Sequence, residues 1–545
     1  MKTILKIGTA SLMMLGATAF TSCTDANDWG TDSSTNRMFS PTGDITLDRY
    51  DTKVGVSFKP VSGASGYQVE LSKDSLYLDE VSESSIVQIF KTADDTIRGL
   101  SGETKYFLRV RTLSDNKPSS KWLYYKTGSG KYYFTTLAEQ LFFELTNEDI
   151  TENAIHTSWV PGSEVTHIVI LANGEEVSSY QLTDQQKAEG KFDVVGLAPT
   201  TTYTIQLFNG DVKRGSLSVT TPVAMPTDGY TYELPSDITV LTKDMMEEIA
   251  AEAIAAGADP ANYSVVIGIP AGITFDIHGT SDDGSSTSVR IPDGMSVTFF
   301  GHAGGDRPVL NLSKSVDIRG SHGFVRFHNI EIKDGGCQYF INQSASCTLG
   351  ELSFDDIHIN GMSRSLVRFQ SSDAKSVEKL IVDNCIIGDQ GNGGYALIYA
   401  NNAAYTIGSI SITNSTFFKL QHNFIQIPDA QVNTVDVKDC TFYNIIGGGR
   451  YFIDAQNKMP EINVENVILA KTFSTTAKGI RSEGEHSVIN TIATSDFVIS
   501  SNKIKGYDEF DGKATDLLKD PENGDYTLKV TSIKSGDPRW IPEEE

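Results

Sequence analysis

A hexapeptide pattern that recurs six times at nearly constant spacing constrains this chain most. Each copy has an apolar residue, a polar residue, an Asn or Asp, two variable residues and a final apolar residue, as in FHNIEI at 327–332. The third position falls, at intervals of 25 to 30 residues, on Asn329, Asp356, Asn384, Asn414, Asp439 and Asn466. Such a period is typical of strands stacked coil upon coil, because one coil cannot bury its apolar face alone. Asn and Asp suit the intervening turn, since they tolerate the left-handed backbone conformation. The pattern predicts a parallel β-helix.

A second series of strands follows four of these positions after 11 or 12 residues. Its apolar pairs, each with the two-residue spacing of one buried face, are Val367 and Phe369, Ala396 and Ile398, Ile425 and Ile427, and Tyr451 and Ile453. An antiparallel sandwich could contain similar strands, but it does not require a fixed period over six units. We therefore expect these pairs to point inward from a second sheet of the β-helix.

The N-terminus has the features of an export signal. Lys2 and Lys6 precede an apolar stretch at 7–20, which is too short to span a membrane with such flanks. The sequence AFTSC ending at Cys23 resembles a bacterial lipobox, and the acidic segment TDAND after it resembles the surface-export signal of Bacteroides-type lipoproteins. An ordinary signal peptide with an incidental Cys is the alternative. We predict a signal peptide at 1–22, lipidation of Cys23, a linker at 23–44 and an outer-membrane, cell-surface location.

The net charge of −25 argues against nucleic acid as a partner, although it leaves room for a local basic groove. Cys337 and Cys347 are close enough in sequence to form a disulfide across a loop. Cys385 and Cys440 follow alternate positions of the Asn ladder, and two coils separate them by roughly 9–10 Å, which is too far for a disulfide. We expect both to be buried thiols.

Two segments before the β-helix have short strands and frequent turns, as in β-sandwiches. In the first, Gly99, Leu100, Thr104 and Tyr106 resemble the tyrosine-corner region of fibronectin type III domains. The second repeats this pattern with the segment GLAPTTTY at 196–203. We therefore predict fibronectin type III-like domains at 45–136 and 139–222, with Trp159 and Tyr203 in the second core. Their simplest role is to lift the distal module off the membrane, and direct binding of glycan or protein is the alternative.

A helix is predicted at 243–256, with Thr242 as N-cap and Gly257 as its stop, and we expect it to cap the β-helix. The region 232–540 resembles the pectate-lyase-like right-handed β-helix family, on the Asn ladder, the stretch GMSRSLVR at 361–368 and the final GDPRW at 536–540. In particular it is similar to Bacteroides lipoproteins that combine fibronectin domains with such a helix and are encoded in polysaccharide-utilisation loci. This resemblance implies an all-β protein that binds long polysaccharides on the outer face of its coils.

Catalytic motifs of the related enzymes are missing. The sequence has neither the Trp-Ile-Asp-His nor the Arg-x-Pro-x-x-Arg motif of pectate lyases, and it lacks the polygalacturonase set. Asp355 and Asp356 form a carboxylate pair, but Asp356 occupies the turn ladder, which favours a structural role over catalysis.

The outward face of the second series is the candidate sugar surface. Its neighbouring positions include Leu366, Leu397, Phe424 and Phe452 together with polar and aromatic residues. The predicted substrate-binding residues are Arg364, Arg368, Tyr395, Tyr399, Gln426, Arg450 and Asp454. Aromatic rings stack on sugars, Arg binds carboxylates and amides bind hydroxyls. The alternative is an ordinary solvated face, and a register shift of one residue would invert the assignment.

Two functions remain open. The first is a cell-surface lipoprotein that binds plant cell-wall polysaccharide of the pectic type, without a cofactor or metal, and that can work beside an outer-membrane glycan transporter complex. The second is a pectate-lyase-type enzyme for uronic-acid glycans, for which calcium is possible and Arg364, Arg368, Lys419 or Arg450 could act as the base. A structural or adhesive role is less specific.

Overall fold

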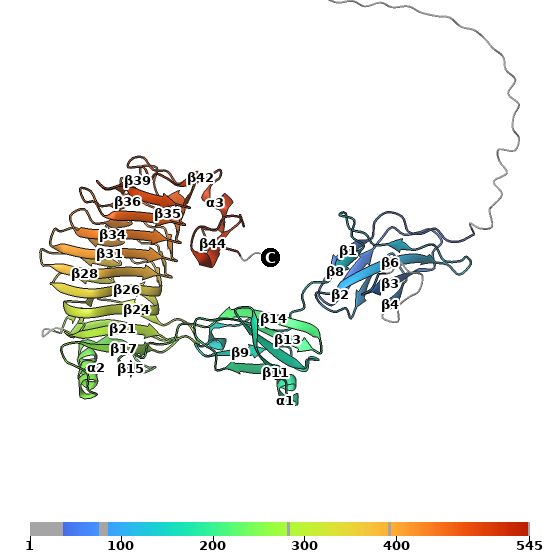
Figure 1. Ribbon diagram of the computed structural model, residues 1–545, viewed down its shortest axis with the longest axis horizontal. Helices are drawn as coiled ribbons and strands as arrows, with labels where there is room; N and C mark the ends of the chain where they lie inside the picture. The colour runs from blue at the N-terminus through green and yellow to red at the C-terminus, as the bar shows by residue number, and fades with distance from the viewer. Residues whose placement is uncertain (1–35, 76–84, 281–283, 391–393, 543–545) are drawn as a thin grey trace, which may run out of the picture.

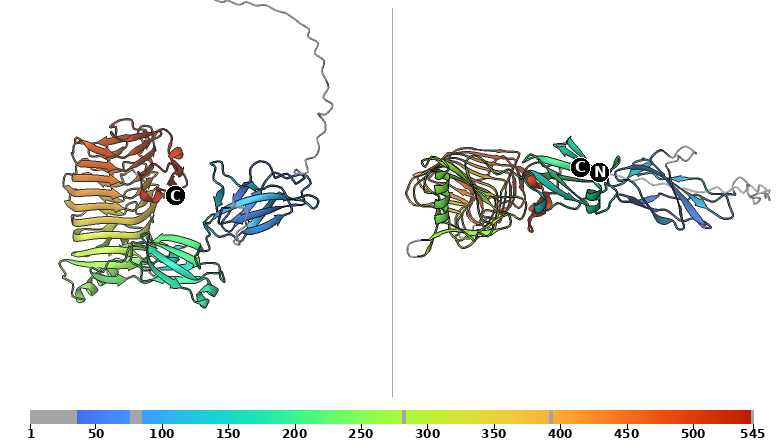
Figure 2. Two further views of the ribbon diagram at one scale, coloured as in Figure 1. Left: turned by 45° about the vertical axis from the view of Figure 1, so that its right-hand side comes forward. Right: turned by 90° about the horizontal axis from the view of Figure 1, so that it is seen from below.

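The computed structural model describes residues 36–75, 85–280, 284–390 and 394–542. Two β-sandwiches come first along the chain, and a tall stack of coils forms the C-terminal part (Figure 1). The second sandwich lies beside the first coils of the stack, whereas the first sandwich lies farther away (Figure 2). The protein is therefore mostly β, with fibronectin type III-like sandwiches followed by a parallel β-helix.

The first sandwich packs two sheets around an apolar core that includes Val56, Val69 and Leu108. One sheet contains β1 (Thr46–Arg49), β2 (Lys53–Ser57) and β5 (Asp94–Arg98). The other contains β3 (Gly66–Ser72), β4 (Ile86–Phe90), β6 (Lys105–Leu113), β7 (Leu123–Tyr124) and β8 (Tyr133–Thr135). The backbone N–H of Ser101 donates to the hydroxyl of Tyr106 at 3.0 Å, which confirms the predicted tyrosine corner.

The second sandwich is built around Trp159, which is fully buried as predicted. Its sheets contain β9 (Ala154–Ser158) with β12 (Lys191–Val195), and β10 (His167–Ala172) with β11 (Glu175–Gln181), β13 (Thr202–Asn209) and β14 (Val212–Thr220). Short helices η2 (Asn147–Asp149) and α1 (Asp184–Glu189) flank these strands. Tyr203 makes a second tyrosine corner, because its hydroxyl accepts a hydrogen bond from the N–H of Ala198 at 3.0 Å.

The β-helix has three parallel sheets, which we name A, B and C. Sheet A stacks β15 (Tyr230–Glu233), β17 (Tyr263–Ile269), β21 (Met295–Gly301), the first parts of β24 (Gly320–Asp334) and β26 (Cys347–Asn360), β28 (Lys375–Asp383), β31 (Tyr405–Thr413), β34 (Gln431–Lys438), β37 (Glu461–Glu465) and β40 (His486–Ile489).

Sheet B stacks β16 (Val240–Thr242), β18 (Thr274–Thr280), β22 (Val309–Leu312), the last parts of β24 and β26, β29 (Ile386–Gly388), β32 (Thr416–Phe418), β35 (Thr441–Ile445), β38 (Ile468–Thr472), β41 (Ile492–Thr494) and β42 (Asp508–Phe510). Sheet C stacks β20 (Val289–Arg290), β23 (Val316–Asp317), β25 (Ile341–Gln343), β27 (Val367–Phe369), β30 (Ile398–Ala400), β33 (Ile425–Gln426), β36 (Tyr451–Asp454) and β39 (Lys478–Arg481). The short β19 (Ser286–Thr287) pairs with β18.

The N-terminal end of the coil stack is capped by helix α2 (Lys243–Ala255), as the sequence predicts. The hydroxyl of Thr242 accepts a hydrogen bond from the N–H of Met245 at 3.2 Å, and Gly257 follows the helix with φ +102°. Met246 and Ile249 are buried in the same core as the first coils. The helix therefore covers apolar residues that a solenoid end would otherwise expose.

The Asn and Asp ladder lies at the corner between sheets A and B. All six predicted positions have left-handed backbone conformations, with φ between 48° and 55°. Side chains link successive coils: the amide of Asn466 donates to Asp439 at 3.0 Å, and that of Asn414 to Asp383 at 2.9 Å. Asn490, with φ 48°, occupies the same corner in a further coil, which the sequence pattern missed. The ladder confirms the predicted role of these residues in the turn.

Replacing Asn414 with Leu should lower the stability of the β-helix by about 1–3 kcal/mol. Leu loses the hydrogen bond to Asp383 and is strained at φ 48°. The measurement is the urea midpoint of the β-helix transition. Asn414→Gly is the matched comparison: it also loses the hydrogen bond but has no backbone strain, so it should lose less stability than Asn414→Leu. A midpoint for Asn414→Leu equal to that of the unmodified protein would contradict this role.

The C-terminal tail folds back over sheet B and reaches well beyond the last coils. Its helix α3 (Ala514–Leu517) and hairpin β43 (Leu518–Asp520) and β44 (Asp525–Leu528) pack on Tyr443, Ile468 and Ala470. The segment then continues past earlier coils to η3 (Pro538–Trp540), where the Arg539 guanidinium donates to the backbone carbonyl of Asn384 at 2.9 Å. Figure 1 shows this tail beside the coils.

The cysteines exclude one pairing that the sequence allowed and confirm one prediction. Cys337 and Cys347 are both free, so the disulfide that their sequence spacing permits is not formed. Cys347 points into the coil core, whereas the Cys337 thiol lies in a loop and donates to the carbonyl of Tyr339 at 2.9 Å. Burial raises the pKa of each of these thiols to about 12. Cys385 and Cys440 are fully buried, as expected, and burial raises the pKa of each.

Candidate functional site

Two files of side chains run along sheet C from coil to coil. The register pairs Val367 with Ile398, Ile398 with Ile425, and Ile425 with Ile453, and all four of these residues are buried. The residue after each of them points outward and forms the first file, which contains Arg368, Tyr399, Gln426 and Asp454. The residue three positions before each forms the second file, which contains Arg364, Tyr395, His422 and Arg450. The seven residues predicted from sequence therefore all lie along one face.

Arginines and tyrosines are packed together in the first part of this face. The Arg364 guanidinium donates to the hydroxyl of Tyr339 at 2.6 Å and lies 5.5 Å from the ring centre of Tyr395. The Arg368 guanidinium lies 4.4 Å from the same ring centre and donates to the hydroxyl of Tyr395 at 3.3 Å. Tyr395 and Tyr399 meet edge to face with centroids 5.2 Å apart. We call Tyr339, Arg364, Arg368, Tyr395 and Tyr399 the Arg–Tyr cluster.

The cluster arginines lack carboxylate partners. Among the ion pairs of the residues that the structure describes, none contains Arg364, Arg368 or Arg450. Other arginines of the β-helix are paired: Arg326 with Glu351 at 2.6 Å and Arg307 with Asp356 at 3.0 Å. Three guanidinium groups without carboxylate partners give this face a local positive charge on a chain with net charge −25.

Several buried polar atoms around the cluster have no hydrogen-bond partner within the described part of the chain. They are Nε of Arg364 and of Arg368, Oε1 of Gln390 and Nδ1 of His422. Gln390 is 2% exposed and His422 is 6% exposed, and both line a small crevice with Tyr395 and Leu420. The crevice has no room for a water molecule, so these unpartnered atoms make it a polar spot beneath the cluster and not a binding cavity.

His422 is held in its neutral form. Burial, and secondarily the charge of Arg450, lower its pKa to about 4 from an ordinary value of 6.5. A neutral imidazole can accept as well as donate a hydrogen bond. At neutral pH, His422 therefore adds an acceptor in the crevice with Tyr395, near the charge of Arg450.

The depressed pKa predicts a pH dependence of stability. Since the unfolded chain takes up the proton first, the stabilisation from neutral His422 is complete above pH 6.5 and is lost as pH falls toward 4. Between pH 6.5 and pH 4, we expect the free energy of unfolding of His422→Gln to fall by about 1–3 kcal/mol less than that of the unmodified protein. Burial also lowers the pKa of His358 to about 4, so that variant keeps the acid sensitivity that comes from His358. A control is His156→Gln, which changes an exposed histidine of the second sandwich. If His422→Gln keeps the full acid sensitivity of the unmodified protein, the environment described for His422 is wrong.

The structure corrects part of the predicted outward face. Leu366, Leu397, Phe424 and Phe452 are at most 3% exposed and belong to the core. Strands of sheet C are only two to four residues long, so the chain turns at the corner before them and period-two alternation does not extend there. Phe424 and Phe452 instead stack inside that corner at 5.4 Å. Tyr451, predicted to point inward, is partly exposed and lies under the guanidinium of Arg481.

The far end of the first file differs from the Arg–Tyr cluster. Asp454 is only 2% exposed and receives two hydrogen bonds from Arg481, at 2.7 and 2.8 Å. Its carboxylate is therefore already neutralised, and it can contribute to a site only through that pair. Gln426 is partly exposed between Tyr399 and Asp454 in the register.

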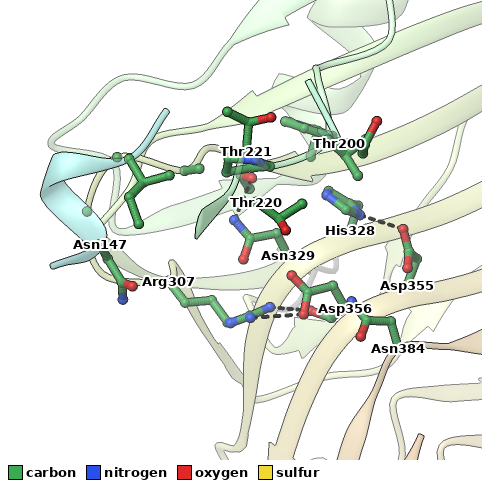
Figure 3. A pocket seen from close by; sticks show the side chains of 18 residues that line it. Asn147, Thr200, Thr220, Thr221, Arg307, His328, Asn329, Asp355, Asp356 and Asn384 are labelled. Carbon is green, nitrogen blue, oxygen red and sulfur yellow. Dashed lines mark hydrogen bonds and ion pairs between the residues drawn. The ribbon is translucent and has the colours of Figure 1, made fainter. Parts of the chain in front are cut away.

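Asp355 and Asp356, the carboxylate pair noticed in the sequence, line a separate cleft between the second sandwich and the β-helix (Figure 3). Asp355 accepts from His328 Nδ1 at 2.7 Å, and Asp356 pairs with Arg307 at 3.0 Å. Asp356 also forms a rung of the ladder with φ 54°. Each carboxylate is engaged with a different basic side chain, which supports the structural role predicted for Asp356.

Sequence reasoning missed Tyr339, Gln390 and His422. His422 could have been found by extending the file of Arg364, Tyr395 and Arg450 by one period, but Gln390 reaches the crevice from the loop after sheet B. Among the described residues, no group of His, Cys, Asp and Glu side chains is arranged to hold a metal ion. No helix in the described part of the chain is long and apolar enough to cross a membrane.

Comparisons with known proteins give limited further information. No curated protein matches the sequence. Among solved structures, the two-domain fibronectin type III segment of chicken tenascin has 16% sequence identity, covers 33% of this chain and 97% of that segment, and has a TM-score of 0.21. The central fibronectin III array of RIM-binding protein has 17% identity, covers 36% of this chain and 66% of that array, and has a TM-score of 0.13. Residues 435–540, which comprise the last coils and the C-terminal tail, match the family model of a domain of unknown function, DUF5123.

Proposed function

We propose that this protein is a lipid-anchored cell-surface protein that binds an acidic plant cell-wall polysaccharide, pectic in type, through sheet C of its β-helix. One observation carries the proposal: Arg364 and Arg368 lie without carboxylate partners among tyrosine rings on one face of a strongly acidic chain, and Arg450 lies farther along the same face. A polymer of uronic acids has the two properties that this face can recognise, which are repeated carboxylates and sugar rings with apolar faces.

The chemistry of each side chain fits this ligand. A guanidinium binds a carboxylate through two parallel hydrogen bonds, and such charge-assisted bonds contribute about 1.5–3 kcal/mol each. Tyr395 and Tyr399 offer ring surface, while Gln426 offers an amide for hydroxyl groups. Successive coils place these groups roughly 4.8 Å apart along the stack, so a chain lying along sheet C would meet several of them.

Anchoring at the outer membrane is the second part of the proposal. It is supported by the basic and apolar N-terminus and by the lipobox-like segment that ends at Cys23, which lies outside the described residues. The two sandwiches would then carry the β-helix away from the membrane surface. In this arrangement the protein would hold polysaccharide for a neighbouring glycan transporter of a polysaccharide-utilisation system.

Replacing Cys23 with Ala should abolish lipidation, because the acylated thiol is removed. We expect the variant protein to lose incorporation of labelled palmitate and to leave the membrane fraction, or to accumulate as an unprocessed precursor. Cys337→Ala, which changes a cysteine of the β-helix, is the control and should remain labelled. Continued palmitate labelling and surface display of Cys23→Ala would exclude this anchor.

Binding and catalysis are separated by one assay on the full mature chain. The protein is passed over immobilised polygalacturonate, and soluble polygalacturonate is followed for unsaturated products by their ultraviolet absorbance, with and without calcium. We expect retention without product. Product formation that disappears in Arg364→Ala or Arg368→Ala would establish the lyase alternative, because elimination needs a base beside the sugar. No retention on this or any other acidic glycan would contradict the proposal.

A further inference from the structure

The cleft between the second sandwich and the β-helix is large enough for a ligand. Its volume is about 440 Å³, which is within the usual range for small-molecule sites. Its lining comes from both domains, as Figure 3 shows: Asn147, Thr200 and Thr220 on the sandwich lie opposite Arg307 and His328 on the β-helix. The cleft lies at the corner of sheets A and B, so it is separate from the face of sheet C that contains the Arg–Tyr cluster.

The wall formed by the β-helix presents charged groups that are already paired. The side chain of Arg307 is 21% exposed and that of its partner Asp356 is 25% exposed, while the side chain of Asp355, which bonds to His328, is 40% exposed. Each pair keeps free donor or acceptor positions, since a guanidinium has five N–H groups and a carboxylate accepts about four bonds. A donor and an acceptor therefore lie side by side at the Arg307–Asp356 pair, which suits neighbouring hydroxyl groups of one sugar ring, and Asp355 offers further acceptor positions.

An aromatic surface completes this wall. His328 stacks on Phe300 with centroids 4.7 Å apart and an angle of 18° between the rings. The bond from Nδ1 to Asp355 fixes the imidazole in this orientation. Across the cleft, Thr200 and Thr220 are exposed and supply hydroxyl groups. The cleft thus combines a flat ring, hydroxyl groups and paired charges.

The balance of charge selects against an acidic ligand. Asp355 and Asp356 face the cleft, and the register places Asp383 next to Asp355 in the following coil. Arg307 is the cationic side chain among the described residues that line the cleft, and Asp356 already engages it, while His328 bonds to Asp355. A polyanion would meet the carboxylates of Asp355 and Asp356 with only Arg307 to offset them, whereas a neutral polyol would meet no such repulsion. This selectivity is opposite to that of the Arg–Tyr cluster.

We propose that this cleft is a second saccharide site, which binds a neutral, hydroxyl-rich oligosaccharide between the second sandwich and the β-helix. The inference rests on the proposed function only in taking a glycan as the ligand of the protein, and it concerns a different face. With both sites occupied, the protein would hold a polysaccharide that carries acidic and neutral segments, or an acidic chain with neutral branches. The second sandwich would then be part of a binding site as well as a spacer.

The test is calorimetric titration of the full mature chain with neutral pentasaccharides derived from galactan, arabinan and xylan. We expect at least one of them to bind, and Thr220→Trp, which fills the cleft from the exposed end of β14, to weaken that binding about 10-fold or more. Ser179→Trp on β11, the opposite edge strand of the same sheet, is the matched control and should bind like the unmodified protein. Asp355→Asn preserves the shape of the side chain but removes a charged acceptor, and it should also weaken binding. This second variant keeps the test decisive if Thr220→Trp does not fold.

Two results would overturn this second site. One is the absence of binding for all three pentasaccharides, and the other is unchanged affinity in both Thr220→Trp and Asp355→Asn. Retention of Thr220→Trp on polygalacturonate distinguishes the two sites, because Thr220 is far from sheet C in the fold and should leave that retention unchanged. Loss of polygalacturonate binding in Thr220→Trp would instead place the acidic ligand in the cleft and contradict the charge argument.

Discussion

The double variant Arg364→Ala/Arg368→Ala should bind polygalacturonate about 100- to 1,000-fold more weakly than the unmodified protein. Each guanidinium is expected to make charge-assisted hydrogen bonds to a uronate, and the loss of about 2 kcal/mol at each position gives this factor. The change also removes the two guanidinium groups that lie 4.4 and 5.5 Å from the ring centre of Tyr395, so these groups no longer hold the orientation of that ring. The measurement is the dissociation constant at fixed ionic strength, because salt screens such interactions.

The control for this prediction is Arg326→Ala. Arg326 is also partly buried and lies beside an aromatic ring, Phe324, but it is neutralised by Glu351 on sheet A. Its removal should change stability and leave the affinity for polygalacturonate within about twofold. Equal losses of affinity in Arg326→Ala and the double variant would show that general charge, and not the Arg–Tyr cluster, holds the polysaccharide.

Asp537→Ala should give the largest loss of stability among single polar substitutions in the β-helix, about 2–3 kcal/mol. The carboxylate is 1% exposed, and it accepts hydrogen bonds from the hydroxyl of Thr416 at 2.7 Å and the N–H of Arg539 at 3.0 Å. Removing it leaves these buried donors without their acceptor. Burial raises the pKa of Asp537, so the cost of desolvating the carboxylate offsets part of the contact energy and keeps the net loss moderate.

Hydrogen exchange would locate the effect of this variant. Asp537 fastens the end of the tail to coils that are more than a hundred residues earlier in the chain, and Trp540 adds a bond from its indole N–H to Thr416 at 2.8 Å. We expect faster exchange in residues 514–540 and in the strands of sheet B beneath them. Asp511→Ala, at an exposed position before α3, is the control. Unchanged exchange of the tail in Asp537→Ala would mean that the apolar contacts of Tyr526 and Leu528 hold it alone.

The stack of coils could be predicted from the sequence because one residue in each coil has a special backbone requirement. The left-handed turn at the corner of sheets A and B selects Asn or Asp, and its recurrence gives both the period and the register. The tyrosine corners of the sandwiches could be predicted for a similar reason, since a single side chain closes a defined turn. Local geometry that repeats leaves a pattern that sequence analysis can find.

The candidate site could be predicted only in part. Arg368, Tyr399 and Gln426 follow from simple alternation along sheet C, whereas Phe424 and Phe452 were misassigned because the chain turns before these short strands. The charge state of the cluster depends on which arginines find carboxylates in neighbouring coils, and one sequence does not contain that information. The cleft beside Arg307 was not predictable, because its two walls come from domains whose relative placement has no local signal.

The most direct test of the account is a structure of the full mature chain with trigalacturonate bound. The account predicts that a sugar carboxylate lies within hydrogen-bonding distance of Arg364 or Arg368, with a pyranose ring against Tyr395 or Tyr399. Trigalacturonate bound at another face, with the Arg–Tyr cluster unoccupied, would contradict the central claim that sheet C recognises acidic polysaccharide.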